Sequence, residues 1–555
     1  MTGTHPIFNQ AEPLVGHDLF EGNEPLRDAL RASDMDLTAL RALGKRLGSA
    51  QMQTHARLAN LHKPVLHRHS PQGRRIDTVE FHPSYHALMD AAVGAGLHGS
   101  PWIEGQAHAH VHRAAAFMMF SELEPSVLCP ISMTYAVMPA LRGNLAVYQD
   151  WAARLGSRRY DPSALAWPHK SGLTIGMGMT EKQGGSDVRA NTTVAVADGH
   201  DAWGARYRVR GHKWFFSAPM SDAFLVLAQT AGGLSCLFMP RVLADGSLNT
   251  WRIERLKDKL GNHANASAEV EFDDAMAYLV GQEGRGIAQI LEMGTLTRLD
   301  CALGTTGLMR AALSLALNHA HQRHAFGKAL IEQPLMRNVL ADLALECEAA
   351  IALCLRLARA IDGRGQAHEA AMARLLTPIA KFWICKRGSA FAQEAMECLG
   401  GNGYVEEGGL SPMARIYREM PLNSIWEGSG NIMALDLLRA LRQSGAIDAL
   451  CDELKAVQGL DAQLDRRLAR LPARVEELAT AGQARVLAQE LALLMQAAGL
   501  LQHAPAAVAA AFCASRLSAA APVFGALPES APLQLLLDRA MPRYPSAAHN
   551  PGDPL

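Results

Sequence analysis

The sequence predicts a mainly α-helical protein with one small β domain inserted between helical segments. At 555 residues the chain is too long for a single hydrophobic core, which favours three or four domains or subdomains. Ala and Leu are abundant while aromatic residues make up only 6% of the chain, a composition typical of helical proteins. The pattern of apolar residues also changes from helical to strand-like near residue 172 and back again near residue 283.

The first domain, expected over residues 1–171, is predicted to be helical. Its clearest segment runs from Ala107 to Glu122, where apolar residues recur at helical spacing between breaks made by prolines. The stretch from His62 to Arg75 is basic and contains no interleaved aromatic residues. We therefore expect a solvent-facing loop there rather than a nucleic-acid groove.

The second domain, expected over residues 172–282, is predicted to consist of short β-strands. Residues Arg206 to Arg210 alternate between apolar and polar, as they do in a half-buried strand. Ala223 to Ala228 and Cys236 to Met239 are short apolar runs, and Gly232-Gly233 between them is typical of a hairpin turn. This region is predicted to be a small β domain.

Two helical regions complete the chain. Residues 283–443 carry apolar residues spaced for long helices with one buried stripe, which predicts a bundle of about four helices. Residues 444–555 form a further helical domain, in which the apolar residues from Leu464 to Leu478 are spaced by three and four. We expect Pro472 to kink or restart that helix, because proline removes a backbone hydrogen bond.

Composition excludes several classes of protein. The net charge of −1 excludes a protein that is basic overall, although a local basic surface stays possible. The nine cysteines are scattered without a Cys-x-x-Cys pair, which favours reduced, mostly buried thiols in a cytoplasmic protein. No secretory signal pattern and no apolar run of bilayer length is evident, so we expect no membrane partner. His108, His110 and His112 would point to different faces of a helix, so we expect no metal site.

The octet Ser-Ile-Trp-Glu-Gly-Ser-Gly-Asn, residues 424–431, is the most informative segment for function. Glu427 stands next to Trp426, which shields it from water and so raises its pKa and its strength as a base. Gly428 and Gly430 let the backbone and a ligand approach closely. Taken alone, the octet equally fits a helix N-terminus with a glutamate at the positive end of the dipole.

Five segments, taken in order along the chain, resemble the cofactor-binding and catalytic segments of acyl-CoA dehydrogenases. They are MGMTEKQGGSDV at 177–188, GHKWFFS at 211–217, RHAFGK at 323–328, CLGGNGYVEE at 398–407 and the octet. Hydroxyl groups and glycine N–H groups of the first segment suit the polar edge and the pyrophosphate of a flavin. The resemblance implies an N-terminal helical domain, a β-barrel-like domain, a four-helix bundle, and here an extra C-terminal helical domain.

The resemblance also implies FAD as cofactor and assigns residues to it. Some of these would reach the FAD of a neighbouring subunit, where an arginine fork suits phosphate oxygens. The assigned residues are Met179, Thr180, Gly185, Ser186, Trp214, Phe216, Ser217, Arg323, Phe326, Gln333, Gly400, Gly401, Trp426, Ser429 and Asn431.

For Glu427 the resemblance implies the role of catalytic base. In the family, the base removes the Cα proton of an acyl-CoA thioester while the Cβ hydride passes to the flavin. The isovaleryl-specific branch places its base on the helix that begins near Leu296, where this chain has Thr297 or Arg298. Glu427 is therefore the only good candidate, and a branched-chain substrate is less directly supported than the shared fold.

Within the superfamily, the chain is most similar to the flavoproteins of the bacterial adaptive response to DNA alkylation. That branch implies a tetramer that binds duplex DNA through its C-terminal domain and keeps only weak acyl-CoA dehydrogenase activity. Residues 444–555 contain nine Lys and Arg against eleven Asp and Glu, so this domain is not basic in bulk. The candidate DNA-binding residues are Arg439, Arg467, Arg470 and Arg474, of which the last three share one helical face.

Nearby acids at Asp465, Glu476 and Glu477 favour a solvated, salt-bridged face for these arginines instead. Two other functions also stay open on the sequence. One is a metabolic acyl-CoA dehydrogenase that uses Glu427, and the other is a flavin-dependent oxygenase on the same fold.

Overall fold

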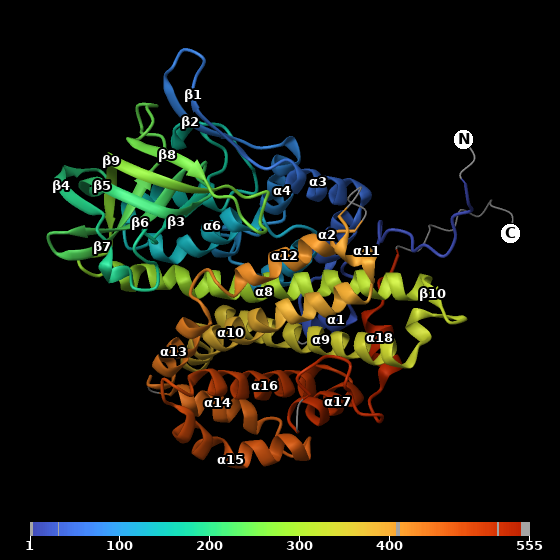
Figure 1. The fold of residues 1–555 in the computed structure, drawn as a ribbon. Helices are drawn as coiled ribbons and strands as arrows, with labels where there is room; N and C mark the ends of the chain where they lie inside the picture. The colour runs from blue at the N-terminus through green and yellow to red at the C-terminus, as the bar shows by residue number, and fades with distance from the viewer. Residues whose placement is uncertain (1–3, 32, 407–410, 444, 519–520, 545–555) are drawn as a thin grey trace.

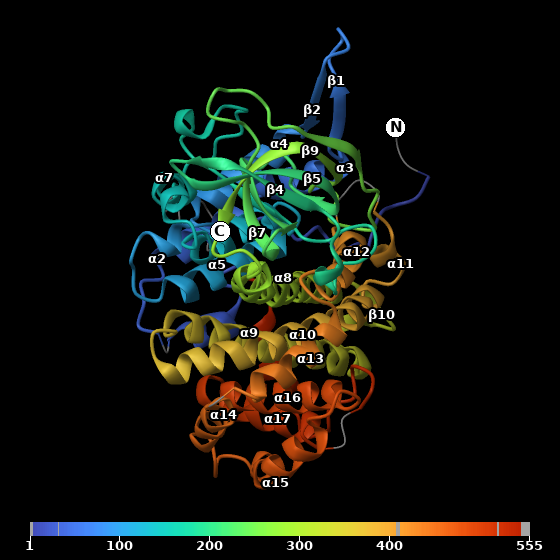
Figure 2. The same cartoon turned by 90° about the vertical axis from the view of Figure 1, so that its left-hand side faces the viewer.

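The computed structural model describes residues 4–31, 33–406, 411–443, 445–518 and 521–544, and its helices and strands form stacked layers. A β domain and the N-terminal helices lie at the top, long helices cross the middle, and the C-terminal helices lie at the bottom (Figure 1; Figure 2). The predicted class, mainly helical with one inserted β domain, is confirmed.

In its described part, the N-terminal domain contains seven α-helices and one exposed hairpin. The helices are α1 (Glu24–Arg31), α2 (Thr38–Gly48), α3 (Ala50–Leu61), α4 (Pro83–Gly94), α5 (Ala109–Leu123), α6 (Leu128–Leu141) and α7 (Leu145–Leu155). The prediction of a loop at His62 to Arg75 was wrong in its structure, because β1 (Val65–His69) pairs with β2 (Arg75–Glu80) in an antiparallel hairpin. Ion pairs from Arg68 and Arg75 to Glu254 tie it to the β domain. The hairpin does face solvent, as predicted.

The middle domain is a closed β sheet. Its strands are β3 (Ile175–Gly178), β4 (Val194–Asp201), β5 (Gly204–Ser217), β6 (Ala223–Thr230), β7 (Gly233–Pro240), β8 (Trp251–Leu256) and β9 (Ser267–Val280). The order is β3-β6-β4-β5-β9-β7, with β8 on β9, and the pairing of β7 with β6 closes the sheet. The predicted turn at Gly232-Gly233 is confirmed, and the φ of 107° at Gly233 explains the glycine.

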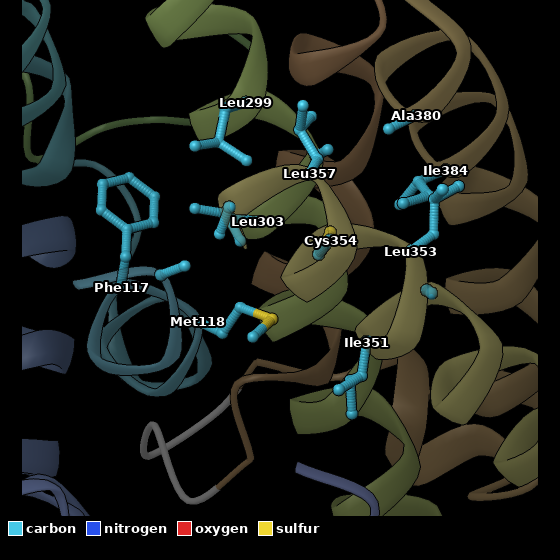
Figure 3. Close-up of a cluster of buried hydrophobic side chains, with 14 of the residues drawn as sticks. Phe117, Met118, Leu299, Leu303, Ile351, Leu353, Cys354, Leu357, Ala380 and Ile384 are labelled. Atoms are coloured by element: carbon cyan, nitrogen blue, oxygen red, sulfur yellow. The ribbon is translucent and has the colours of Figure 1, made fainter. Parts of the chain in front are cut away.

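Long helices form the predicted bundle. They are α8 (Gly286–Gln322), α9 (Pro334–Asp362), α10 (Ala367–Glu397), α12 (Met413–Asn423) and α13 (Gly430–Leu441), with the short elements β10 (His324–Ala325), β11 (Lys328–Ala329) and α11 (Gly401–Tyr404) between them. Leu303 of α8, Leu353 of α9 and Ile384 of α10 are buried together (Figure 3). Phe117 and Met118 of α5 reach the same cluster, so the N-terminal domain and the bundle share one core.

The C-terminal helices are α14 (Ala446–Lys455), α15 (Ala462–Leu478), α16 (Ala484–His503), α17 (Ala506–Arg516) and α18 (Leu533–Ala540). The expectation that Pro472 restarts a helix was wrong, since α15 runs continuously through it. Pro472 lies on the exposed side, where the helix buries Leu464, Leu471 and Val475 on its other face. The last helix, α18, returns to the middle layer (Figure 1), where Arg539 pairs with carboxylates of α1 and α9.

Helix α16 is the only helix among the described residues that is long and apolar enough to cross a bilayer. The sequence was expected to contain no run of that length. However, 72% of its most apolar window is buried inside the protein, where it packs on α9, α10 and α13. It is therefore placed as a core helix. All nine cysteines are free thiols and all but Cys451 are buried, as predicted.

Candidate active site

Glu427 lies in the connection between α12 and α13, and residues of α8 and α10 hold this connection in place. Its Oε2 atom accepts a hydrogen bond of 2.7 Å from the Thr297 hydroxyl of α8. Its backbone carbonyl accepts a hydrogen bond of 3.0 Å from Arg298 Nε, also on α8. The buried amine of Lys381 on α10 donates to the carbonyls of Gly428 and Asn423 at 2.7 and 3.0 Å. These bonds fix the loop that presents the carboxylate.

The backbone of Glu427 is strained, with a φ of 59° in the left-handed region. Residues other than glycine rarely adopt this conformation, and such strain is concentrated at functional sites. The hydrogen bonds from Arg298 and Lys381 to the flanking carbonyls supply the interactions that hold the loop in it. The connection before α13 thus fixes the position of the Glu427 side chain.

Burial is the largest influence on the Glu427 carboxyl and raises its pKa above the ordinary value. The Thr297 hydrogen bond and the charges of Arg298 and Lys381 lower the pKa and offset part of this effect. Arg298 forms an ion pair of 3.0 Å with Asp436 of α13. Arg374 forms a second ion pair with the same aspartate. Because Asp436 shares the positive charge, Arg298 does not act as a simple counterion, and the carboxyl stays a stronger base than a solvated one.

The sequence identified Thr297 or Arg298 as the position of the base in the isovaleryl-specific branch. The fold brings both residues into contact with Glu427. Neither can take a proton near neutral pH, since threonine is not basic and the arginine is already protonated. The sequence did not reveal that they support Glu427, and Lys381 was missed altogether. A buried lysine in an apolar helix would have been the only signal for it.

The predicted flavin-binding turn from Met179 to Ser186 is tightly organised. Glu181 lies at its centre and forms an ion pair of 2.7 Å with Lys213, with both side chains fully buried. The same carboxylate accepts hydrogen bonds from the backbone N–H groups of Thr192 and Thr193. These contacts account for the lowered pKa of Glu181, about 2, which burial alone would raise.

Within this turn, Gly185 and Ser186 are exposed and Thr180 is half-buried, so their polar groups are accessible to a ligand. A Cβ atom at Gly185 would lie 2.6 Å from the Thr180 hydroxyl, so no larger residue fits there without a shift. The backbone N–H of Trp214 donates a hydrogen bond of 2.8 Å to the backbone carbonyl of Thr180. This bond joins the segment at 177–188 to the segment at 211–217.

The strand with Trp214, Phe216 and Ser217 is only partly as expected. Trp214 is half-buried and carries the Lys257 amine 3.3 Å above its ring. The ring of Phe216 is fully buried in the core of the β domain, against Phe224 and Trp251, and the assignment of this residue to the cofactor stays a prediction. A register shift between Lys213 and Phe216 breaks the alternation of faces along β5.

Three further residues assigned to the cofactor lie at or next to the β10–β11 hairpin, which follows α8. Arg323 donates to the Asn9 carbonyl, Gln333 donates to the Ala325 carbonyl, and Phe326 is 96% exposed in the short β10–β11 hairpin. This hairpin is at the end of α8 away from the β domain (Figure 1). Gly400 has a φ of 59°, and a Cβ at Gly401 would meet open space.

Close to Glu427, the Trp426 indole donates to Asn423 Oδ1 at 2.9 Å, and Ser429 stands at the N-cap of α13. Asn431 accepts a hydrogen bond of 3.0 Å from Arg485 of α16, so its amide oxygen already has a partner from the C-terminal domain.

Arg467, Arg470 and Arg474 of α15 line a cavity of about 450 Å³, whose apolar lining consists of leucines. Arg467 and Arg474 both pair with Glu490, at 3.2 Å each. Arg470 is exposed and makes no ion pair with any described residue. Arg439 is 63% exposed and lies 3.6 Å from Asp436. The salt-bridged interpretation therefore applies to Arg467 and Arg474, while Arg470 has its charge uncompensated.

His108, His110 and His112 do not converge. His110 is buried and shares a hydrogen bond of 2.6 Å with the Tyr135 hydroxyl. Over the described ranges, no group of three His, Cys, Asp or Glu side chains is placed to hold a metal ion.

Comparisons with known proteins place this geometry in a family. The family model described as the N-terminal domain of the adaptive response protein AidB matches residues 9–162. The acyl-CoA dehydrogenase middle domain matches 176–275, and the acyl-CoA dehydrogenase C-terminal domain matches 284–442.

Full-length relatives agree with these matches. The chain is 51% identical over 521 residues to the acyl-CoA dehydrogenase-like protein AidB of Escherichia coli (strain K12), covering 92% of this chain and 94% of AidB. It is 32% identical to acyl-CoA dehydrogenase family member 11 of Caenorhabditis elegans, over 78% of this chain and 72% of that protein. The crystal structure of C. elegans ACDH-11 in complex with C11-CoA superposes with a TM-score of 0.83 at 26% identity, covering 97% and 93% of the two chains. The chain therefore belongs to the AidB-like acyl-CoA dehydrogenase family, whose members use FAD.

Proposed function

We propose that this chain is a cytoplasmic, FAD-containing protein of the adaptive response that binds duplex DNA and protects it from alkylation. We further propose that it keeps weak acyl-CoA dehydrogenase activity toward isovaleryl-CoA-like thioesters. The observation that carries the proposal is the 51% identity to AidB over 92% of the chain, together with the AidB-type N-terminal domain.

The turn from Met179 to Ser186 fits FAD. Its shape depends on Gly185, whose missing side chain leaves room beside Thr180, and its exposed hydroxyl and N–H groups match the hydrogen-bonding edge of a flavin. Thr180, Ser186 and Trp214 would hold the cofactor here. When bound, FAD supplies the acceptor for the hydride of the substrate.

Glu427 supplies the base of the reaction. Its carboxylate takes the proton from the Cα atom of the thioester, a weakly acidic site that needs a positioned and desolvated base. Thr297 fixes one carboxylate oxygen, so the other, Oε1, is the atom that receives the proton. Because its pKa is raised, the carboxylate binds the Cα proton more strongly than a solvated glutamate does.

A homotetramer accounts for the position of Arg323, Phe326 and Gln333. Arg323 lies 26 residues beyond Thr297 on α8, which corresponds to about 39 Å along the helix axis. These residues therefore need a neighbouring subunit to meet a cofactor. In support, Phe326 is 96% exposed and Leu335 is 82% exposed, large apolar areas that a partner surface would cover.

We assign the DNA contact to the α15 cavity, and Arg470 is its central residue. Arg470 has no ion pair with any described residue, so it can neutralise a phosphate without first breaking a salt bridge. Arg467 and Arg474 pair with Glu490, and Arg474 also pairs with Glu477. Together with Arg470 they are three arginines against two carboxylates, which leaves this edge positive although the domain as a whole is not basic.

The salt dependence of duplex DNA binding tests this assignment. Each phosphate contact contributes about 0.9 to the slope of log K against log salt, so Arg470→Gln should flatten the slope by about that amount. Arg466→Gln is the matched control, because Arg466 is exposed on the same helix and its side chain bonds only to its own turn, at the Ala462 carbonyl. Equal slopes for the two variants would contradict the assignment.

A metabolic acyl-CoA dehydrogenase is the second candidate, and the intact, oriented Glu427 favours it. Steady turnover of acyl-CoAs with an electron-transferring flavoprotein as acceptor, together with absence of salt-dependent DNA binding, would select this function. DNA binding that persists in Glu427→Gln would select the adaptive-response function.

A further inference from the structure

A second cavity, of about 620 Å³, lies between the N-terminal helices and the bundle. Helices α2, α3 and α5 form one side, and α8 with the start of α12 forms the other. Its apolar lining includes Leu19, Leu47, Ala56, Leu123, Ala311 and Leu315. This volume is in the range of small-molecule sites.

This cavity is separate from the Glu427 site. Ala311 lies 14 residues beyond Thr297 on α8, which is about 21 Å along the helix axis. None of the lining residues bonds to Glu427 or to the residues that hold it. A ligand here would not occupy the position of a reacting thioester.

Glu122 lines the cavity without a protein partner. Its side chain is on α5 and only 9% exposed, and it makes no hydrogen bond with any residue that the structure describes. A buried carboxyl group without a partner is unfavourable, and a ligand oxygen would satisfy it. Burial raises the pKa of Glu122 to about 8, so at neutral pH the group is an uncharged acid that can donate a hydrogen bond.

The charged groups around the cavity are predominantly cationic. Arg57 of α3 makes no ion pair within the described ranges. Arg415 of α12 donates only to the backbone carbonyls of Ala56 and Leu123, and its Nε atom has no partner. Arg418 is neutralised by Glu406. An anionic group would therefore find two guanidinium groups that no carboxylate has taken.

We propose that this cavity binds an amphipathic anion, a linear apolar chain that ends in a single carboxylate or phosphate group. The chain lies against the leucine-rich lining and the anion is held by Arg57, with Arg415 close by. The uncharged Glu122 donates a hydrogen bond to a ligand oxygen.

Several charged groups face Glu122 and contribute to any pH dependence. Arg310 of α8 lowers its pKa, and Cys347 of α9 is close enough to be influenced by it. His17 is neutral at pH 7, because burial and Arg310 lower its pKa to about 4. The other titratable residues that line the cavity are Arg57, Lys63, His263, Glu406, Arg415 and Arg418. Among these groups, Glu122 is the one with a shifted pKa just above neutrality.

Calorimetric titration of the full chain with dodecanoate, dodecyl phosphate, dodecanol and dodecylammonium tests the proposal. Dodecanoate or dodecyl phosphate should bind one per chain, and the tighter of the two identifies the anionic group. Arg57→Gln should weaken this binding about tenfold or more, because it removes a charge-assisted contact. Arg466→Gln, on an exposed and distant helix, should leave it unchanged. Equal binding of dodecanol or dodecylammonium would overturn the proposal.

Two further variants locate the site. Ala311→Phe should fill the cavity and abolish binding, whereas excess acyl-CoA should not displace the probe. Affinity should fall as the pH rises through about 8, where Glu122 becomes an anion, and Glu122→Gln should remove this dependence. Displacement by acyl-CoA, or binding that survives both Arg57→Gln and Ala311→Phe, would show that the probe binds elsewhere and overturn the inference.

Discussion

Removing the Thr297 hydroxyl should make Glu427 a carboxyl of still higher pKa. The hydroxyl donates to Oε2 at 2.7 Å and lowers the pKa by stabilising the ionised form. Valine has nearly the same shape as threonine, so Thr297→Val deletes this bond with little change in packing. A hydrogen bond to a charged group contributes about 1.5–3 kcal/mol, which corresponds to about one to two pKa units.

The sign of the effect is set by the direction of the shift. Because the pKa of Glu427 rises, the ionised base is populated only at higher pH, and the acidic limb of the rate profile should move upward by about one to two units. The assay is the anaerobic rate of flavin reduction by an acyl-CoA, measured between pH 5 and 9, a window of about four units around the carboxyl.

Thr295→Val is the matched control, because Thr295 is half-buried on the same helix and donates only to the Leu291 carbonyl. Its profile should match that of the original chain. A Thr297→Val profile that keeps its acidic limb in place, whatever its amplitude, would refute the idea that this hydroxyl sets the basicity of Glu427.

Substitutions at three other positions test the flavin-binding turn, the buried ion pair and the charge behind the base. Gly185→Ala should greatly lower the flavin content of the purified protein, because its Cβ would lie 2.6 Å from a hydroxyl, while Gly184→Ala, which meets open space, should retain it. Lys213→Met should destabilise the chain to urea by about 3–5 kcal/mol because a buried carboxylate loses its partner, and adding Glu181→Gln should restore most of this loss. Asp436→Asn should leave an unpaired guanidinium behind the base, lower the pKa of the base and move the acidic limb downward. An unchanged flavin content, urea midpoint or acidic limb, respectively, would contradict each expectation.

The domain order could be predicted because it depends on local patterns. Gly232-Gly233 between two apolar runs identified a hairpin from residues that are neighbours in sequence. The β1–β2 hairpin was missed because its strands are rich in charged and polar residues, and a few residues such as Val79 carry its apolar contacts. Pro472 was over-interpreted, since a proline on the exposed side of a helix costs only local hydrogen bonds there.

The candidate site was predictable in its main residue but not in its supports. Glu427 could be identified from the octet at 424–431. The contacts that Thr297 and Lys381 make with this segment join residues that are far apart in sequence. The burial of the Phe216 ring could not be predicted, because a register shift inside β5 leaves no signature in the residue pattern. The Glu181–Lys213 pair likewise depends on which strands become neighbours.

The central claim is that Glu427 is the base that acts beside a bound flavin. Anaerobic mixing of the purified protein with isovaleryl-CoA tests it most directly, followed as the loss of flavin absorbance near about 450 nm. The account predicts that the original chain is bleached and that Glu427→Gln, with the same flavin content, is not. Bleaching of Glu427→Gln at the rate of the original chain would contradict the claim.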